Sequence, residues 1–329
     1  MLKQRILLFS LFVLFFQCQT ATNPTTDAIA TKTQPVDLVE PLVDAANSRW
    51  FFFNSATRPF GMVNLSPDMV INGAWNSGYR YKQDTIRCFS HVHAWQLSAI
   101  PVLPTTGAFK GHLGSDKYGS KYTHEKETVK AGYHQVYLED YDIDAELTAT
   151  TRVGFHRYTF PAAEQSHIHV DFSTFLGPND TESGYAKKIN NREIAGYALM
   201  GPTRRRPKAT YVYYVIQFDK DFEKFGTWQN GQLQEGTEIE GEKTGAYVSF
   251  ATKNKEQRLM KVGISYVSTE QARLNIQTEL THWDFDKTVA ATQTEWNNWL
   301  SKIEIEGGTE KNNVDFTPTY GMLYKAVEF

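Results

Sequence analysis

The sequence predicts a mainly β protein, a large antiparallel β-sandwich followed by a linker helix and the start of an α-helical domain. Three observations lead to this fold class. From about residue 36 to residue 275, short alternating runs recur between Gly, Pro, Asn and Asp. Aromatic residues are 14% of the 329 residues, and such side chains favour the half-buried surface of a sheet. Near residue 286 the periodicity becomes helical.

The strand-like runs justify the sandwich. Their spacing is typical of antiparallel pairing, and they lie at 134–160, 167–174, 209–219, 245–252 and 260–268. No internal repeat is recognisable. We therefore assign residues 36–285 to one N-terminal sandwich domain.

Two helical patterns follow. Residues 286–306 carry large apolar side chains at helical spacing, which predicts a linker helix. In residues 307–329, Thr317 is a good N-cap and Pro318 suits the first helical position. The apolar stripe that follows consists of Tyr320, Leu323, Tyr324 and Val327. We expect this stripe to begin a truncated helical domain; the alternative is a short helix that packs back on the sandwich.

The N-terminus has the features of an export signal. Lys3 and Arg5 precede an apolar run that is too short to span a bilayer. Cys18 follows at once, and the Thr-rich, weakly hydrophobic residues 19–35 predict a flexible tether. We expect residues 1–18 to be a signal peptide. The mature protein is then secreted across the inner membrane, either free in the periplasm or anchored in the outer membrane by a lipid on Cys18.

The charge pattern argues against a nucleic-acid partner. The 34 Lys and Arg are scattered among 37 Asp and Glu, and the formal net charge is −3. Binding of phosphates needs a concentrated positive surface. The short basic run at residues 204–208 is more typical of a solvated loop.

Residues 58–107 hold the densest group of motifs. RPFGMVNLSPDM spans 58–69, GAWNSGYRYKQDTIRCFSHVHAW spans 73–95, and LPTTG spans 103–107. In this order and spacing they resemble glycoside hydrolase family 92, the calcium-dependent inverting α-mannosidases of bacteria. The resemblance extends over about residues 36–329 and is weaker in the helical part.

This resemblance implies a galactose-mutarotase-like supersandwich packed on an (α/α)6 barrel. The barrel carries the catalytic acid and base and most of the Ca²⁺ site, and the sandwich contributes loops to a pocket for mannose-containing glycans. We therefore expect no catalytic residue and no metal ligand here, and no mannosidase activity from this chain alone. An inverting glycosidase needs two carboxyl groups about 6.5–9.5 Å apart, and no such pair stands out. Asp68, after Ser66 and Pro67, is interpreted as a turn residue.

Six residues are expected to bind substrate. The resemblance places them in the sugar pocket: Phe60, Gly61, Trp75, Tyr79, His91 and His93. Trp75 lies among turn-forming residues and is predicted to stack on mannose. Gly61 lets the backbone approach a ligand closely, or meets the requirement of a turn.

The two histidines of residues 91–93 leave three interpretations open. In an extended strand both imidazoles point to one face. They bind sugar hydroxyls, or form a packed hydrogen-bonded pair, or begin a zinc site that needs a third ligand. A second pair, His167 and His169, has no motif support and predicts the polar face of a strand.

Two other classes of function fit the same sequence. The chain is either a non-catalytic carbohydrate-binding lipoprotein at the cell surface, or a structural lipoprotein without a ligand. Sugar binding without hydrolysis would distinguish the first from an enzyme, and loss of all sugar binding would indicate the second.

Overall fold

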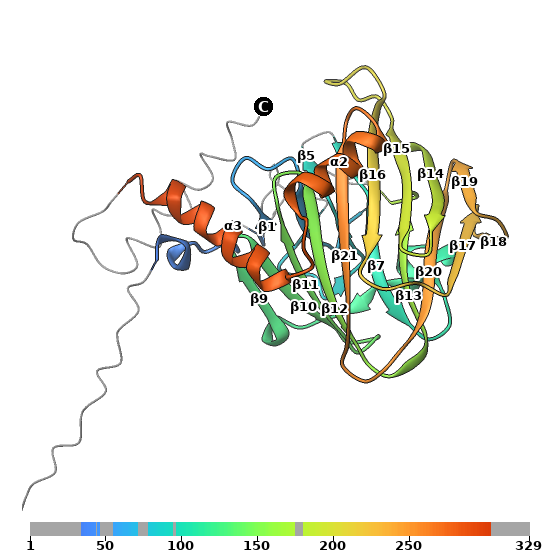
Figure 1. Ribbon diagram of the computed structural model, residues 1–329, viewed down its shortest axis with the longest axis horizontal. Coiled ribbons are helices and arrows are strands. Elements are labelled where there is room, and N and C mark those ends of the chain that lie inside the picture. Colours follow the sequence, from blue (N-terminus) through green and yellow to red (C-terminus); the bar gives the residue numbers. More distant parts are fainter. Residues whose placement is uncertain are drawn as a thin grey trace, which may run out of the picture. The chain divides into compact units, whose positions relative to one another are not determined.

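Two antiparallel sheets face each other across one core (Figure 1). The computed structural model describes residues 34–43, 45–46, 55–71, 78–94, 97–174 and 180–303. Residues 1–33 and 304–329, which hold the predicted leader, most of the tether and the second predicted helix, lie outside this part. The predicted fold class is confirmed.

The larger sheet, as described, has nine strands. Their order is β19 (Glu238–Gly241), β14 (Thr181–Asn190), β15 (Glu193–Met200), β16 (Thr210–Phe218), β21 (Glu256–Ser265), β12 (Val153–Phe160), β11 (Ile143–Ala149), β10 (Tyr133–Leu138) and β9 (Glu127–Lys130).

The smaller sheet has eight strands in the described residues. Their order is β1 (Ala56–Thr57), β2 (Asn64–Asp68), β4 (Cys88–Ser90), β7 (Val102–Thr106), β13 (Ala163–Asp171), β20 (Thr244–Thr252), β17 (Lys224–Gln229) and β18 (Gln232–Gln234). Two short ribbons pair β3 (Thr85–Ile86) with β8 (Ser120–Lys121), and β5 (Val92–Ala94) with β6 (Leu97–Ala99).

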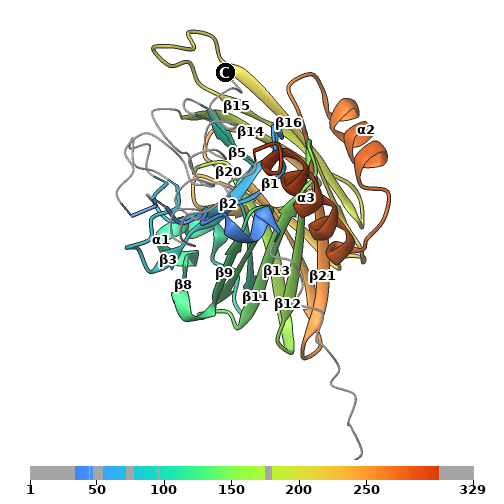
Figure 2. The same cartoon turned by 90° about the vertical axis from the view of Figure 1, so that its left-hand side faces the viewer.

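Alternation decides which side chains enter the core. Along β16, Val212 and Tyr214 are fully buried between the sheets, while Tyr211 and Tyr213 point outward. From the smaller sheet, Ile168 of β13 enters the same core. Figure 2 shows the sheets as two layers, with α2 (Thr269–Glu279) outside the larger sheet.

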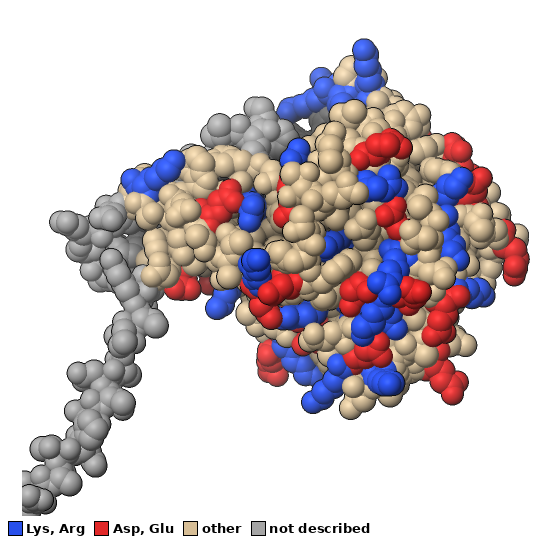
Figure 3. Space-filling view, in the orientation of Figure 1, with Lys and Arg blue, Asp and Glu red and all other residues tan. Residues whose placement is uncertain are grey.

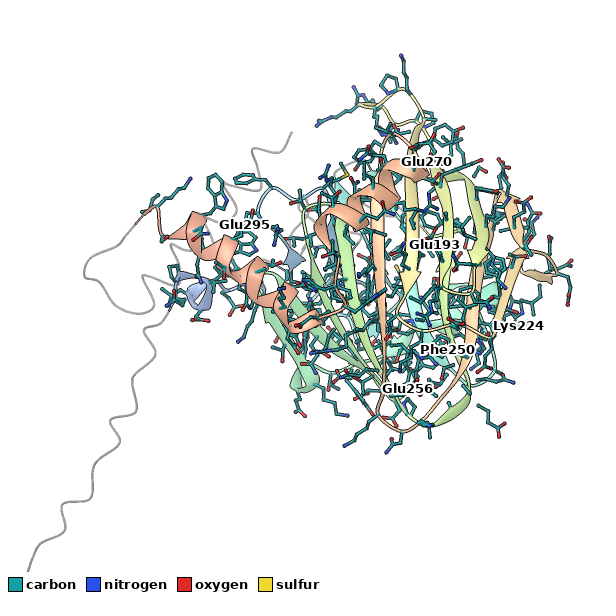
Figure 4. The ribbon with its side chains drawn as sticks, viewed as in Figure 1. Glu193, Lys224, Phe250, Glu256, Glu270 and Glu295 are labelled. Atoms are coloured by element: carbon teal, nitrogen blue, oxygen red, sulfur yellow. The ribbon has the colours of Figure 1, made fainter. Side chains whose placement is uncertain are left out.

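Helix α2 was not predicted from the sequence. Ser268 caps it, and only Ala272, Asn275 and Ile276 are buried. A helix that buries so few side chains has a weak helical periodicity in its sequence, and for this reason α2 was not predicted. Arg273 pairs with Glu193 of β15 at 2.6 Å and fixes the helix on the sheet (Figure 4).

Helix α3 (Phe285–Leu300) forms where a linker helix was predicted. Asp284 caps it, and Trp296 Nε1 donates to Thr57 O at 2.8 Å. It also contacts the 3-10 helix η1 (Pro35–Leu38) through Asn297, whose Oδ1 accepts from Val36 N at 2.8 Å.

The remaining short helices lie between β7 and β9 in the sequence. They are η2 (Gly111–Leu113), α1 (Ser115–Tyr118) and η3 (His124–Lys126). Basic and acidic side chains are interspersed over the face shown in Figure 3. None of the helices that the structure describes is both long and apolar enough to cross a membrane.

Candidate functional site

The three motif segments follow one another in the sequence and meet in the smaller sheet. Strand β2 of the first pairs with β4 of the second, with Pro67 opposite Phe89. Strand β4 in turn pairs with β7 of the third, with Phe89 opposite Val102. Five of the six predicted substrate-binding residues lie near these strands in the described residues, and Trp75 lies outside them.

His93 is fixed between two oxygen atoms. Its Nε2 lies 2.6 Å from Asp68 Oδ1, and its Nδ1 lies against Asn64 O. Because a carbonyl oxygen only accepts, Nδ1 carries a proton and donates it to Asn64. The contact between Nε2 and the carboxylate is a second hydrogen bond, and both side chains are buried.

Asp68 is not a turn residue, and that interpretation was wrong. It is the last residue of β2 and has no exposed surface. Its Oδ2 accepts from Ser90 N at 3.2 Å, and Cys88 Sγ lies 3.5 Å away. Burial, followed by the Asp68 charge, raises the pKa of the Cys88 thiol well above its ordinary value. Through these bonds to Ser90 and His93, Asp68 of β2 connects β2 with β4 and β5.

His91 lies at the bend between β4 and β5 and reaches the opposite sheet. Its Nδ1 donates to Ile100 O at 2.7 Å, and its Nε2 lies 2.8 Å from His156 Nε2. His156 Nδ1 accepts from Tyr158 OH at 2.8 Å, so every nitrogen has one partner if both rings are neutral. Burial lowers the pKa of His91 to about 4. It lowers the pKa of His156 well below its ordinary value.

The two imidazoles of residues 91–93 therefore do not share one face. His91 has no exposed surface and makes the contacts of the packed alternative. Its contact with sugar stays a prediction that these hydrogen bonds do not support. The zinc alternative also lacks support, since no three His, Cys, Asp or Glu side chains within the described residues gather to hold a metal ion.

Tyr79 belongs to a buried polar cluster centred on Glu127. Tyr79 OH donates to Glu127 Oε1 at 3.0 Å, and His134 Nε2 donates to the same oxygen at 2.8 Å. His124 Nδ1 lies 2.5 Å from Oε2, and Ser55 Oγ lies 2.5 Å from His134 Nδ1. We call these five residues the Glu127 cluster.

The Glu127 cluster keeps its carboxylate ionised although the carboxylate is buried. Burial alone would raise the pKa of Glu127, but the hydrogen bond and charge of His134, followed by the hydrogen bonds of His124 and Tyr79, hold the pKa below its ordinary value. Burial also raises the pKa of Tyr79 far above its ordinary value. Glu127 therefore acts as an acceptor of several hydrogen bonds.

The cluster holds Tyr79 and Ser55 in place through hydrogen bonds. Tyr79 follows residues 72–77, which include Trp75, and Ser55 follows residues 47–54 in the sequence. The sequence analysis missed Glu127 and His134. One signal was present: His134 occupies an inward position of β10, where Val136 and Leu138 are apolar.

Phe60 and Gly61 form the turn between β1 and β2. Phe60 has φ 56° and is 37% exposed, and its ring meets the Trp299 ring of α3 edge-on at 4.8 Å. A Cβ on Gly61 would lie 3.1 Å from Arg58 O, which supports the turn requirement for this glycine. Arg58 also pairs with Glu295 of α3 at 3.0 Å (Figure 4). The turn is therefore fixed on α3.

The second histidine pair lies on β13, where it shares a polar face with Asp171 as predicted, and this face is buried. His167 Nδ1 lies 2.8 Å from Ser249 Oγ. The His169 ring packs against the Tyr118 ring at 4.5 Å. Tyr118 of α1 donates to Asp171 at 2.8 Å, so α1 covers this face of the sheet.

Solved structures share this architecture. A family GH92 α-mannosidase from Bacteroides thetaiotaomicron is 27% identical, with a TM-score of 0.78, and the match covers 89% of this chain and 41% of that one. The same enzyme in complex with mannoimidazole matches at 26% identity with a TM-score of 0.77, over 88% and 40% of the two chains. A family GH92 inverting mannosidase from that species, 22% identical with a TM-score of 0.76, shares the fold over 90% and 40% of the chains.

The chain thus spans about two fifths of the length of these structures. No curated relative matches it. The model of the glycosyl hydrolase family 92 N-terminal domain matches residues 38–265, and that of the family 92 catalytic domain matches residues 271–329. The first match alone covers more than half of the sequence, and the chain belongs to glycosyl hydrolase family 92.

Proposed function

We propose that this chain is the N-terminal, pocket-forming part of a secreted α-mannosidase that hydrolyses terminal α-mannosides of glycans with inversion. Family membership supports the hydrolase class. The similar structures support the sugar, because they are α-mannosidases and one of them holds mannoimidazole.

The observation that carries the proposal is the meeting of the motif segments at β2, β4 and β7. The buried Asp68–His93 pair connects β2 with β5 beside these strands. The Glu127 cluster fixes the residues beside 72–77, where Trp75 is expected to stack on mannose. In this proposal the buried polar groups position the pocket wall, and the wall itself orients the sugar and excludes water.

The catalytic acid and base belong, in this proposal, to the helical part of the complete enzyme. So does most of the Ca²⁺ site, where the ion would hold sugar hydroxyls. Ca²⁺ takes six to eight oxygen ligands, whereas both carboxylate oxygens of Asp68 already have protein partners. Within the described residues no group of three or more His, Cys, Asp or Glu side chains could hold the ion, and we derive no catalytic step from it.

The hydrolysis assay tests the proposal directly. We expect the enzyme expressed from the complete reading frame to release mannose from an α-mannoside as the β-anomer, observed by NMR. The purified 329-residue chain should show no turnover. Turnover by this chain would place the acid and base within it, and a complete protein that binds mannosides without cleaving them would favour the non-catalytic lipoprotein.

We also propose that the mature protein is anchored in the outer membrane through Cys18. Metabolic labelling with a radioactive fatty acid should mark the wild-type protein and not a Cys18→Ser variant. Equal labelling of the two proteins would contradict the anchor, and an unlabelled wild-type protein in the periplasm would show simple secretion.

A further inference from the structure

Four tyrosines gather on the outer face of the larger sheet. Tyr185 of β14 lies opposite Tyr197 of β15, and Tyr197 lies opposite Tyr213 of β16. Tyr211 precedes Tyr213 by two residues and shares its face. We call these four residues the tyrosine platform. Their strands lie side by side at the end of the sheet away from α3 (Figure 1).

The rings are in contact and remain accessible. The Tyr185 and Tyr197 ring centroids are 5.5 Å apart, and those of Tyr197 and Tyr211 are 5.1 Å apart. The Tyr211 and Tyr213 rings are nearly parallel, at 5.5 Å. Tyr211 is 42% exposed and the other three are partly exposed. Since neighbouring strands lie about 4.8 Å apart, the row from Tyr185 to Tyr213 spans about 10 Å.

Two carboxylates fix the orientation of the rings. Tyr185 OH donates to Glu238 Oε2 at 3.0 Å, and Tyr197 OH donates to Glu240 Oε1, both on β19. Lys187 pairs with Glu238 at 3.0 Å. Among the described residues, the second oxygen of each carboxylate has no hydrogen-bond partner, and both glutamates are exposed. Burial, with the Glu240 hydrogen bond, raises the pKa of Tyr197 to about 12, so its hydroxyl stays protonated.

The backbone below the platform is supported from the core. Tyr214 OH donates to Tyr185 O at 3.0 Å. A Cβ on Gly196 would lie 1.9 Å from that oxygen, so only glycine fits between the strands. The next outward residues of the same strands, Ala195 and Val215, are covered by α2, whereas the platform is not. The rings are therefore held in place without being covered.

We propose that the tyrosine platform binds a neutral glycan chain. The face of an aromatic ring is negative and attracts the apolar C–H face of a pyranose. The remaining oxygens of Glu238 and Glu240 can accept hydrogen bonds from sugar hydroxyls at the edge of the platform. The same carboxylates repel anionic ligands such as nucleic acids. This site lies on the larger sheet and goes beyond the mannose pocket proposed at the motif strands.

Affinity electrophoresis of the folded 329-residue chain in gels containing mannan, glucan, galactan or xylan tests the inference. We expect retardation by at least one of these polymers. A Tyr197→Ala/Tyr213→Ala variant should weaken the retention constant about tenfold, the loss of two ring contacts. Tyr197→Phe, which keeps the ring and removes the bond to Glu240, should weaken it less.

The matched control is Tyr137→Ala. Tyr137 also points outward from the larger sheet and donates to a carboxylate, that of Asp142, but it lies on β10. Its loss should leave binding unchanged, and far-UV circular dichroism should show that all variants are folded. Adding mannoimidazole separates the two proposed sites, because it should displace a glycan from a mannose pocket and not from the platform.

Two outcomes would overturn the platform: no retardation by any of the four polymers, or equal retardation of the double variant and the wild type. Neither outcome bears on hydrolysis by the complete enzyme, so failure of this inference and failure of the proposed function are distinguishable.

Discussion

The motif region and the tyrosine platform use polar side chains in opposite ways. In the motif region, the side chains of Asp68 and His93 are buried and bond to each other, and the buried carboxylate of Glu127 on β9 bonds to Tyr79 and His134. At the platform, Tyr197 and Tyr211 remain at the surface, and the carboxylates of Glu238 and Glu240 accept hydrogen bonds from tyrosine hydroxyls. The first arrangement determines where segments of the chain lie. The second presents rings to a ligand directly. The comparison shows that residues in a dense sequence motif can stabilise the interior of the fold as readily as they form a contact surface.

Of the variants that test this comparison, Asp68→Ala is expected to lower the free energy of unfolding most. It leaves His93 and Ser90 N without their acceptor inside the sheet, and breaking a buried pair costs about 3–5 kcal/mol. Urea unfolding of the 329-residue chain should show this loss. Asp68→Asn keeps the shape and should lose less. A loss below about 1 kcal/mol for the alanine variant would mean that the pair does not support the strands.

Acid should destabilise the motif region through His91. Its pKa falls from 6.5 in the unfolded chain to about 4 in the fold. Its contribution is complete above pH 6.5 and is lost as the pH falls through this window, because the unfolded chain binds the proton first. The loss at this residue is about 3 kcal/mol, at 1.36 kcal/mol per pKa unit. In a His91→Gln/His156→Gln variant the free energy of unfolding should fall less steeply over this range; an unchanged slope would refute the role of the pair.

Glu127→Ala should cost about 2–3 kcal/mol, because Tyr79, His124 and His134 lose a charged acceptor. It should also speed proteolysis within residues 72–77, since the cluster attaches their neighbour Tyr79. Glu125→Ala, at an exposed position two residues away, is the matched control and should change neither measurement. Unchanged cleavage in the Glu127 variant would show that the cluster does not position this segment.

Trp75→Ala in the complete enzyme should reduce kcat/KM by an amount equivalent to about 1–3 kcal/mol, the value of one stacking or packing contact of this size. A platform variant, Tyr211→Ala, should leave hydrolysis of a small α-mannoside unchanged. Steady-state kinetics on a small substrate measure both. An unaffected rate in the Trp75 variant would remove this residue from the pocket wall.

Part of the fold was predictable from local sequence pattern alone. Alternating side chains identified β10 to β12 and β16, because one face of each strand must be apolar to enter the core. The helical spacing of Trp296 and Leu300 identified α3. Helix α2 escaped because it buries too few residues to give a period.

The sequence by itself determined the fold class, the family and the motif residues, because each can be recognised from residues that are close together in the chain. Only the tertiary structure decided what those residues do. The bend at His91 sends its ring to His156 in the larger sheet, while His93, two residues later on β5, contacts Asp68 of β2 in the smaller sheet. No spacing along the chain encodes such pairings, because the partners are brought together by the packing of different strands, and burial then lowers the pKa values of His91 and His156.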